Sequence, residues 1–331
     1  MSRARRIVFV ITLAAAAYLV AVPFALSLFS RTSDAETLSD YYRPLMSEEG
    51  IRYQRNNLRV VNAAGDEVPT VFLPRLQTEL GMDEAQFNAY VADNFPHVAA
   101  FLKRAPEVVA YLNPGLEKVL AQGDNFEDAD QFPLANLDVR VGPWSLLLLG
   151  LGLVVIAVLV RVGTSPVPVV AVFVVGLGLV VGPPVLGWFH QTEAAEQVAE
   201  AARGPFTSGL ANTTVDDTYK FDAAITEIRE AMFPAIGRRL GLSDPELDTF
   251  LHDSFPDTMR FLDAWRDNVY RTSRALTLSL IEYMDEFHNA DATPYEALPW
   301  VFIAPGAVLL LTGAFGLLSA RRRAAAPAQR S

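Results

Sequence analysis

The sequence predicts an all-α integral membrane protein with four transmembrane helices and two homologous, mainly helical extracytoplasmic domains produced by tandem duplication. Three observations predict this fold class: four long apolar runs, an uneven distribution of charge between the segments that flank them, and a match of the chain to itself at an offset of 160 residues. These observations describe organisation and carry no catalytic signature, so the sequence does not reveal what the protein does.

The four apolar runs contain no Asp, Glu, Lys or Arg. They comprise residues 7–29, 144–160, 167–189 and 300–320. A helix needs about 20 apolar residues to cross the hydrocarbon core of a bilayer, so the second run is only just long enough. A soluble helix of this length would carry a polar face, and none of the runs does. We therefore expect four transmembrane helices.

The first run has an alternative interpretation as a cleaved signal peptide, because it follows basic residues and is rich in alanine. Its apolar stretch is longer than the 7–15 residues usual for a signal, and no clear small-residue cleavage site follows Phe29. It also matches the third run, which lies inside the chain. The sequence therefore favours a retained membrane anchor.

Charge predicts the orientation of these spans. Residues 1–6, 161–166 and 321–331 carry eight cations and no acid, whereas all 38 acidic residues lie in 30–143 and 190–299. The two acidic segments have net charges of −8 and −11. Positively charged flanks remain in the cytoplasm, so we expect both termini inside and both polar segments outside.

Composition indicates a bacterial plasma membrane. Arginine outnumbers lysine by 24 to 3, as in proteins of GC-rich genomes, and the chain has no cysteine. The outer segments would therefore fold without disulfide bonds. Trp144, Trp188 and Trp300 fall at the predicted outer interface, a level that tryptophan prefers.

The internal match defines a repeated structural motif in the two polar segments. Its members are Gly81, Asp83, Phe95 and Pro96 in the first copy, and Gly241, Ser243, Phe255 and Pro256 in the second. Asp83 with Gln86, and Ser243 with Glu246, have the spacing of a capping box. Each predicted helix carries an apolar stripe that we expect to be buried, and each ends before its proline.

The remainder of both polar segments is predicted to be mainly helical. Residues 58–72 alternate weakly, which leaves a short β-hairpin as an alternative, and residues 113–115 (Asn-Pro-Gly) predict a turn or kink. Each segment has about 110 residues, enough for its own modest core. We expect a pseudo-two-fold axis along the membrane normal and a binding groove between the copies.

A second repeated motif, Asp-x-Phe-x-(Asp/Asn)-Ala-Asp-x-x-Pro, occupies residues 124–133 and 285–294. Its oxygen ligands could hold Ca²⁺; the candidate ligands are Asp124, Asp128, Asp130, Asp285 and Asp291. The motif lacks the glycine and the distal glutamate of an EF-hand loop, and its second copy has less charge. The favoured interpretation is a capped turn leading into the membrane, with no metal or other cofactor.

Other signatures of activity are weak. The four histidines lack zinc-ligand spacing, and no nucleotide-binding or hydrolase motif occurs. The acidic outer segments would repel nucleic acid. The spans contain no ionisable coupling residue, which argues against ion-coupled transport.

Small residues and prolines within the spans predict local packing. Gly178 with Gly182, and the glycines at 150, 152, 313 and 316, would permit close helix contacts. Pro23 and Pro183-Pro184 should bend their helices near the outer leaflet.

These features lead to one favoured function and two alternatives. We expect a non-catalytic plasma-membrane protein that contacts membrane lipids and docks an envelope protein partner or an amphiphilic ligand through its outer domains. A lipid or envelope-precursor transport component is one alternative, although the cytoplasmic segments offer little surface to an ATPase. The other is an extracytoplasmic enzyme that uses carboxylates such as Asp93 and Asp253 or those of the cluster at 124–130.

Overall fold

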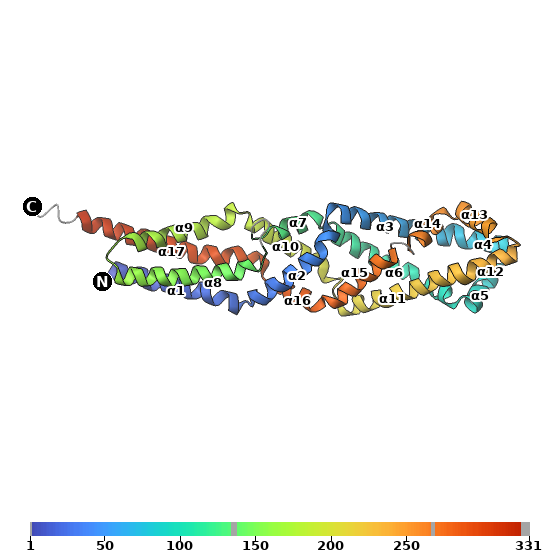
Figure 1. The fold of residues 1–331 in the computed structure, drawn as a ribbon, viewed down its shortest axis with the longest axis horizontal. Coiled ribbons are helices and arrows are strands. Elements are labelled where there is room, and N and C mark those ends of the chain that lie inside the picture. The colour runs from blue at the N-terminus through green and yellow to red at the C-terminus, as the bar shows by residue number, and fades with distance from the viewer. Residues whose placement is uncertain (1, 134–137, 266–268, 326–331) are drawn as a thin grey trace, which may run out of the picture. The chain divides into compact units, whose positions relative to one another are not determined.

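The computed structural model describes residues 2–133, 138–265 and 269–325, and these residues form helices and no strands (Figure 1). The chain divides into two compact units. Unit 1 comprises Met1–Arg43, Asp124–Ala199 and Asp285–Ser331, and unit 2 comprises Pro44–Gly123 and Glu200–Met284. Each unit therefore draws on both the first and the second half of the chain.

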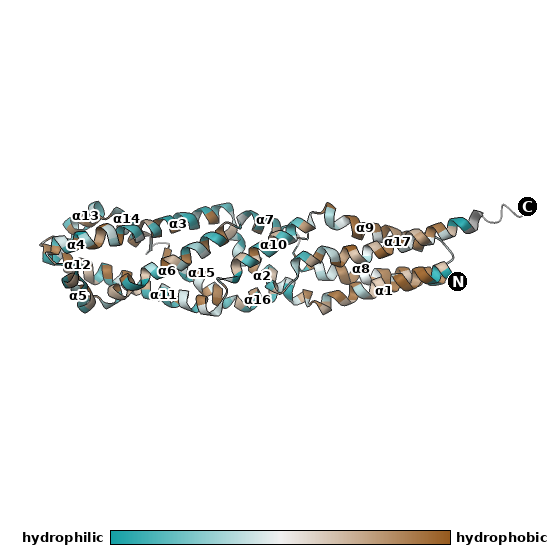
Figure 2. Ribbon diagram, turned by 180° about the vertical axis from the view of Figure 1, so that it is seen from behind, coloured by the Kyte–Doolittle hydropathy of each residue, from teal (hydrophilic) through white to brown (hydrophobic). Residues whose placement is uncertain are grey.

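Unit 1 contains four helices that are long and apolar enough to cross a membrane, as predicted. They are α1 (Arg3–Ala25), α8 (Val141–Val162), α9 (Val167–Val185) and α17 (Leu298–Ala325). Hydrophobic residues dominate these four helices (Figure 2). Helix α1 packs along α8, α9 packs along α17, and α1 also contacts α17.

Two of the predicted spans end earlier than their apolar runs. Helix α1 ends two residues after Pro23, and α9 ends one residue after Pro184. Each is followed by a residue with left-handed backbone, Ser27 at φ 52° and Gly187 at φ 73°, which terminates a helix. The prolines thus lie in the last helical turn. New helices begin directly afterwards: α2 (Leu28–Met46) and α10 (Trp188–Arg203).

Glycine spacing identified only part of the close packing. A Cβ atom on Gly150, Gly313 or Gly316 would collide with a neighbouring helix, whereas one on Gly152, Gly178 or Gly182 would meet nothing within 4 Å. Helices α9 and α17 instead meet closely at Gly176 and Gly306, and a Cβ on Gly306 would lie 2.6 Å from Leu179 Cβ. The Gly178/Gly182 prediction is therefore wrong, because these two residues lie on an open part of α9.

Unit 2 is formed by two series of helices. The first series is α3 (Glu48–Glu67), α4 (Leu73–Leu80), α5 (Glu84–Asn94) and α6 (Pro96–Leu120). The second is α11 (Ser208–Glu227), α12 (Phe233–Leu240), α13 (Asp244–Ser254), α14 (Pro256–Ala264) and α15 (Tyr270–Glu282). The starts of α4, α5 and α6 lie 160 residues before those of α12, α13 and α14.

A π-helical turn joins α3 to α4 at Val68–Phe72, and another joins α11 to α12 at Ile228–Met232. Each turn is followed at its second residue by a proline, which has no N–H to donate. The hairpin considered for residues 58–72 is therefore wrong. Of the turn or kink expected at residues 113–115, the turn is absent, because α6 continues through Pro114. Asn113 Nδ2 donates to Asn62 Oδ1 on α3 at 2.6 Å.

The repeated capping motif is confirmed. Asp83 accepts a hydrogen bond from the Gln86 amide at 2.8 Å, and the Asp83 amide donates to the Gln86 side chain at 3.1 Å. In the second copy, the Glu246 carboxylate accepts from the Ser243 amide at 2.9 Å. Gly81 and Gly241 adopt φ values of 64° and 71°. The stripes Phe87, Val91, Phe95 and Leu247, Leu251, Phe255 are buried.

Unit 2 has one hydrophobic core that includes residues from both halves of the chain. The Phe72 ring contacts the Phe255 ring with 4.9 Å between centroids, and it also contacts Phe233. We expected a separate core in each polar segment. The apolar residues of one series are covered by those of the other, so a shared core buries more apolar surface than two separate cores would.

Two glutamates reinforce this shared core by capping helices of the opposite half. The Glu227 carboxylate accepts from the Val98 amide on α6 at 2.8 Å, and the Glu67 carboxylate accepts from the Thr258 amide on α14 at 2.5 Å. Each amide belongs to the third residue of its helix and lacks a partner within it. A negative charge is also favourable at this end of a helix.

The glycine contacts make a matched prediction. Gly306→Ala should destabilise the packing of α9 on α17 by about 1–3 kcal/mol through overpacking, and Gly178→Ala should be neutral. Thermal unfolding of the detergent-solubilised proteins compares the two variants. Equal melting temperatures would contradict the close approach at Gly306.

The reciprocal caps make a second prediction. Glu227→Ala should lower the free energy of unfolding by about 1–2 kcal/mol, because the α6 amide loses its acceptor. Glu230→Ala, which removes an exposed carboxylate one turn away, should have little effect. Chemical denaturation followed by circular dichroism measures both changes, and a neutral Glu227→Ala would argue against the cap.

Candidate functional site

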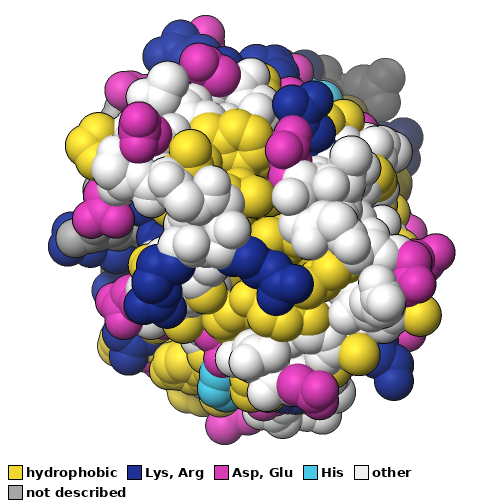
Figure 3. Space-filling model, turned by 90° about the vertical axis from the view of Figure 1, so that its right-hand side faces the viewer, with side chains coloured by type: hydrophobic (Ala, Val, Ile, Leu, Met, Phe, Trp, Pro, Cys, Tyr) yellow, Lys and Arg dark blue, Asp and Glu magenta, His cyan; other side chains and the backbone are white. Residues whose placement is uncertain are grey.

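The candidate site is the end face of unit 2, at the turns that join α4 to α5 and α12 to α13. Figure 3 shows hydrophobic side chains gathered in a hollow at the centre of this face, with Lys and Arg side chains beside them. Met82 and Leu242 occupy the two turns and are half-buried against the shared core. The capping boxes fix both turns, and the face therefore combines rigid backbone with accessible apolar surface.

Charges of both signs lie near this face, because the two turns also carry the exposed acidic residues Asp83, Glu84, Asp244 and Glu246. Arg238 and Arg239 are exposed in the last turn of α12, and the Arg239 guanidinium lies 5.5 Å from the Tyr90 ring centroid. Arg75 on α4 pairs with Glu79 at 3.0 Å.

The first seven residues of each Asp-rich motif are helical, and the turn that we favoured is confined to the last three residues, 131–133 and 292–294. The motif contributes α7 (Gly123–Asp130) and α16 (Met284–Asp291). The helical conformation allows Asp130 to bind two side chains of α2, Ser39 at 2.5 Å and Arg43 at 2.8 Å. The motif thus attaches helices to each other within unit 1.

The proposed metal ligands have other positions and partners. Asp128 lies 3.0 Å from His190 Nε2, and Asp291 also has an interaction partner. Asp124 and Asp285 lie in the first turns of their helices. Within the described parts of the chain, no group of three or more His, Cys, Asp or Glu residues is placed to hold a metal ion.

A buried charge cluster in unit 2 was not found from the sequence. The Asp217 side chain is 4% exposed and accepts hydrogen bonds from Tyr111 at 2.8 Å and from the Arg104 guanidinium at 3.2 and 3.3 Å. Burial, together with the bond to Asp217, raises the pKa of Tyr111 to about 12. The carboxylate is fully engaged, so the cluster links α6 to α11 and offers no free base. Asp93 and Asp253, considered earlier as catalytic carboxylates, are exposed on α5 and α13.

Comparison with protein-family models, curated proteins and solved structures gave no match to this chain.

The Asp130 contacts predict a dependence of stability on pH. Burial raises the pKa of Asp130, but the hydrogen bonds from Arg43 and Ser39 outweigh it, and the net pKa is lowered. This carboxylate therefore contributes stability above its unfolded pKa, and the contribution is lost as the pH falls through the lower folded pKa.

Asp130→Asn should reduce the free energy of unfolding at neutral pH by about 1 kcal/mol, because the side chain is partly exposed. The difference from the parent should shrink below about pH 4, where this carboxyl begins to protonate in the unfolded chain while the folded chain still holds it ionised. Thermal unfolding across this range measures it, and a constant difference would contradict the assigned pKa direction.

Proposed function

We propose that the protein is a non-catalytic component of a bacterial plasma membrane that docks an envelope protein partner on the end face of unit 2. The observation that carries the proposal is the apolar hollow with arginines beside it. Exposed apolar patches bordered by polar residues are typical of interaction sites. Arg238 and Arg239 favour a partner segment that combines apolar side chains with carboxylates placed opposite these two residues.

Four transmembrane spans with both termini in the cytoplasm and unit 2 outside belong to this proposal. The distribution of charge supports that orientation. The Arg5 guanidinium donates to the carbonyl oxygens of Gly163 and Ser165, so two of the three basic segments lie at the same end of the helical bundle.

We also propose that the chain arose by tandem duplication. Support comes from several unrelated local features that each recur at the same spacing of 160 residues. These are the left-handed residues Ser27 and Gly187, the π-helical turns, the two capping boxes and the capping residues Glu67 and Glu227.

Site-specific cross-linking tests the docking face. A photoreactive side chain at position 82 should capture one protein in the native membrane, and the double variant Arg238→Glu/Arg239→Glu should lose that product. The matched double variant Arg55→Glu/Arg59→Glu reverses two exposed cations on α3 and should retain it. Capture that is insensitive to the first double variant would contradict the proposed face.

Reporter fusions test the orientation independently of any partner. Fusions after Ser30 and Ala297 should report an extracytoplasmic position, and a fusion after Thr164 should report the cytoplasm. A cytoplasmic signal at Ala297 would overturn the four-span topology.

A further inference from the structure

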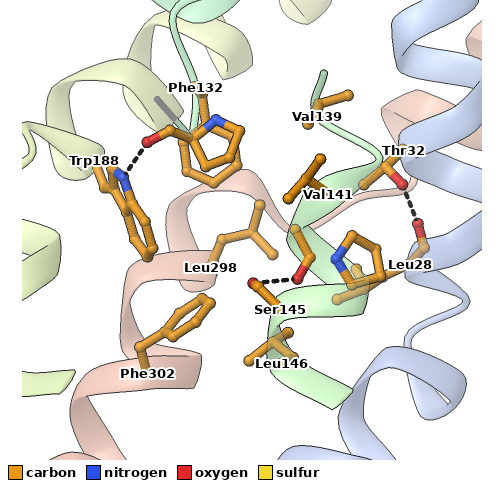
Figure 4. A pocket seen from close by; sticks show the side chains of 13 residues that line it. Leu28, Thr32, Phe132, Val139, Val141, Ser145, Leu146, Trp188, Leu298 and Phe302 are labelled. Carbon is orange, nitrogen blue, oxygen red and sulfur yellow. Dashed lines mark hydrogen bonds between the residues drawn. The ribbon is translucent and has the colours of Figure 1, made fainter. Parts of the chain in front are cut away.

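Unit 1 contains a cavity of about 260 Å³ near the ends of its apolar helices (Figure 4). Its wall includes Leu28 and Thr32 of α2, Leu146 of α8, Trp188 of α10 and Phe302 of α17. Residues from both halves of the chain therefore enclose one space. The volume is slightly below the roughly 300–1,000 Å³ typical of pockets for whole small molecules, which suits part of a larger ligand.

The polar side chains in this wall have their hydrogen bonds directed at the backbone. Thr32 Oγ1 donates to the Leu28 carbonyl and Ser145 Oγ donates to the Gly142 carbonyl, each at 2.7 Å. The Trp188 indole N–H donates to the Pro133 carbonyl at 2.6 Å. These donors are already satisfied, so the wall presents mainly hydrocarbon and aromatic surface to an occupant.

The aromatic part of the wall is held in place by ring contacts. Trp188 packs edge-on against Phe132 and Phe302, with centroids 5.6 and 4.9 Å away. An apolar cavity of this kind holds water poorly and accepts apolar ligands. If nothing filled the cavity, the residues that line it would lose dispersion contacts on that side.

We propose that this cavity holds one acyl chain of a bilayer phospholipid. The occupant follows from position, because the cavity lies where α8 and α17 begin and where Trp144 and Trp300, each 56% exposed, are predicted to meet the membrane interface. A hydrocarbon chain matches the wall chemically and can enter while its head group stays at that interface. The proposal rests on the membrane insertion proposed above and is independent of the docking face.

Fluorescence quenching by brominated phospholipid tests the proposal. The full chain carrying Trp144→Phe and Trp300→Phe is reconstituted into phosphatidylcholine vesicles with brominated acyl chains, which leaves Trp188 near the cavity and Trp265 in unit 2. Ser145→Phe places a ring in the cavity wall, and Leu148→Phe places the same ring on α8 at a residue that is 66% exposed. Leu146→Phe provides a second cavity-filling variant.

Quenching of Trp188 is expected in the starting protein and with Leu148→Phe, and most of it should be lost with Ser145→Phe or Leu146→Phe. Equal quenching in all four proteins would assign it to surrounding lipid and overturn the proposal. Quenching only by a brominated free fatty acid would also overturn it. A control protein that keeps Trp144 and replaces only Trp300 reports insertion itself. Quenched Trp144 with unquenched Trp188 would refute the acyl-chain site while leaving the membrane topology intact.

Discussion

The organisation of unit 2 depends on a single constraint: each half of the chain needs the other to cover part of its apolar surface and to cap one of its helices. The Phe72 ring of the first half packs against Phe255 of the second, and each half supplies the carboxylate that caps a helix of the other. An uncapped amide and an uncovered aromatic stripe are both costly. The two series of helices therefore fold as one unit, and the ion pair of Arg104 with the buried Asp217 adds a further link between them.

Several local features could be predicted because they depend on short sequence spacing. The capping boxes at Asp83 and Ser243, the left-handed glycines and the buried stripes follow from chemistry within a few residues. The apolar spans follow from composition in the same way. The end of α1 before Ser27 was harder to predict, because a non-glycine residue adopts the left-handed backbone there.

The remaining features depend on contacts between distant residues. Nothing in the spacing of Gly178 and Gly182 distinguishes them from Gly176 and Gly306, because only the facing helix decides which glycine is close. The end face of unit 2 and the cavity of unit 1 are likewise assembled from separate segments. One sequence signal could have pointed to the capping roles of Glu67 and Glu227: the same acidic residue occurs at equivalent positions in both halves.

The shared core of unit 2 can be tested by chemical cross-linking, because the chain has no native cysteine. The Phe101 and Phe221 rings come from different halves and have centroids 4.7 Å apart. A short thiol cross-linker should therefore join Phe101→Cys to Phe221→Cys within one molecule, giving a monomer whose two labelled peptides are covalently linked. Linkage only between molecules, or no linkage despite full labelling of both thiols, would contradict the interlocked arrangement.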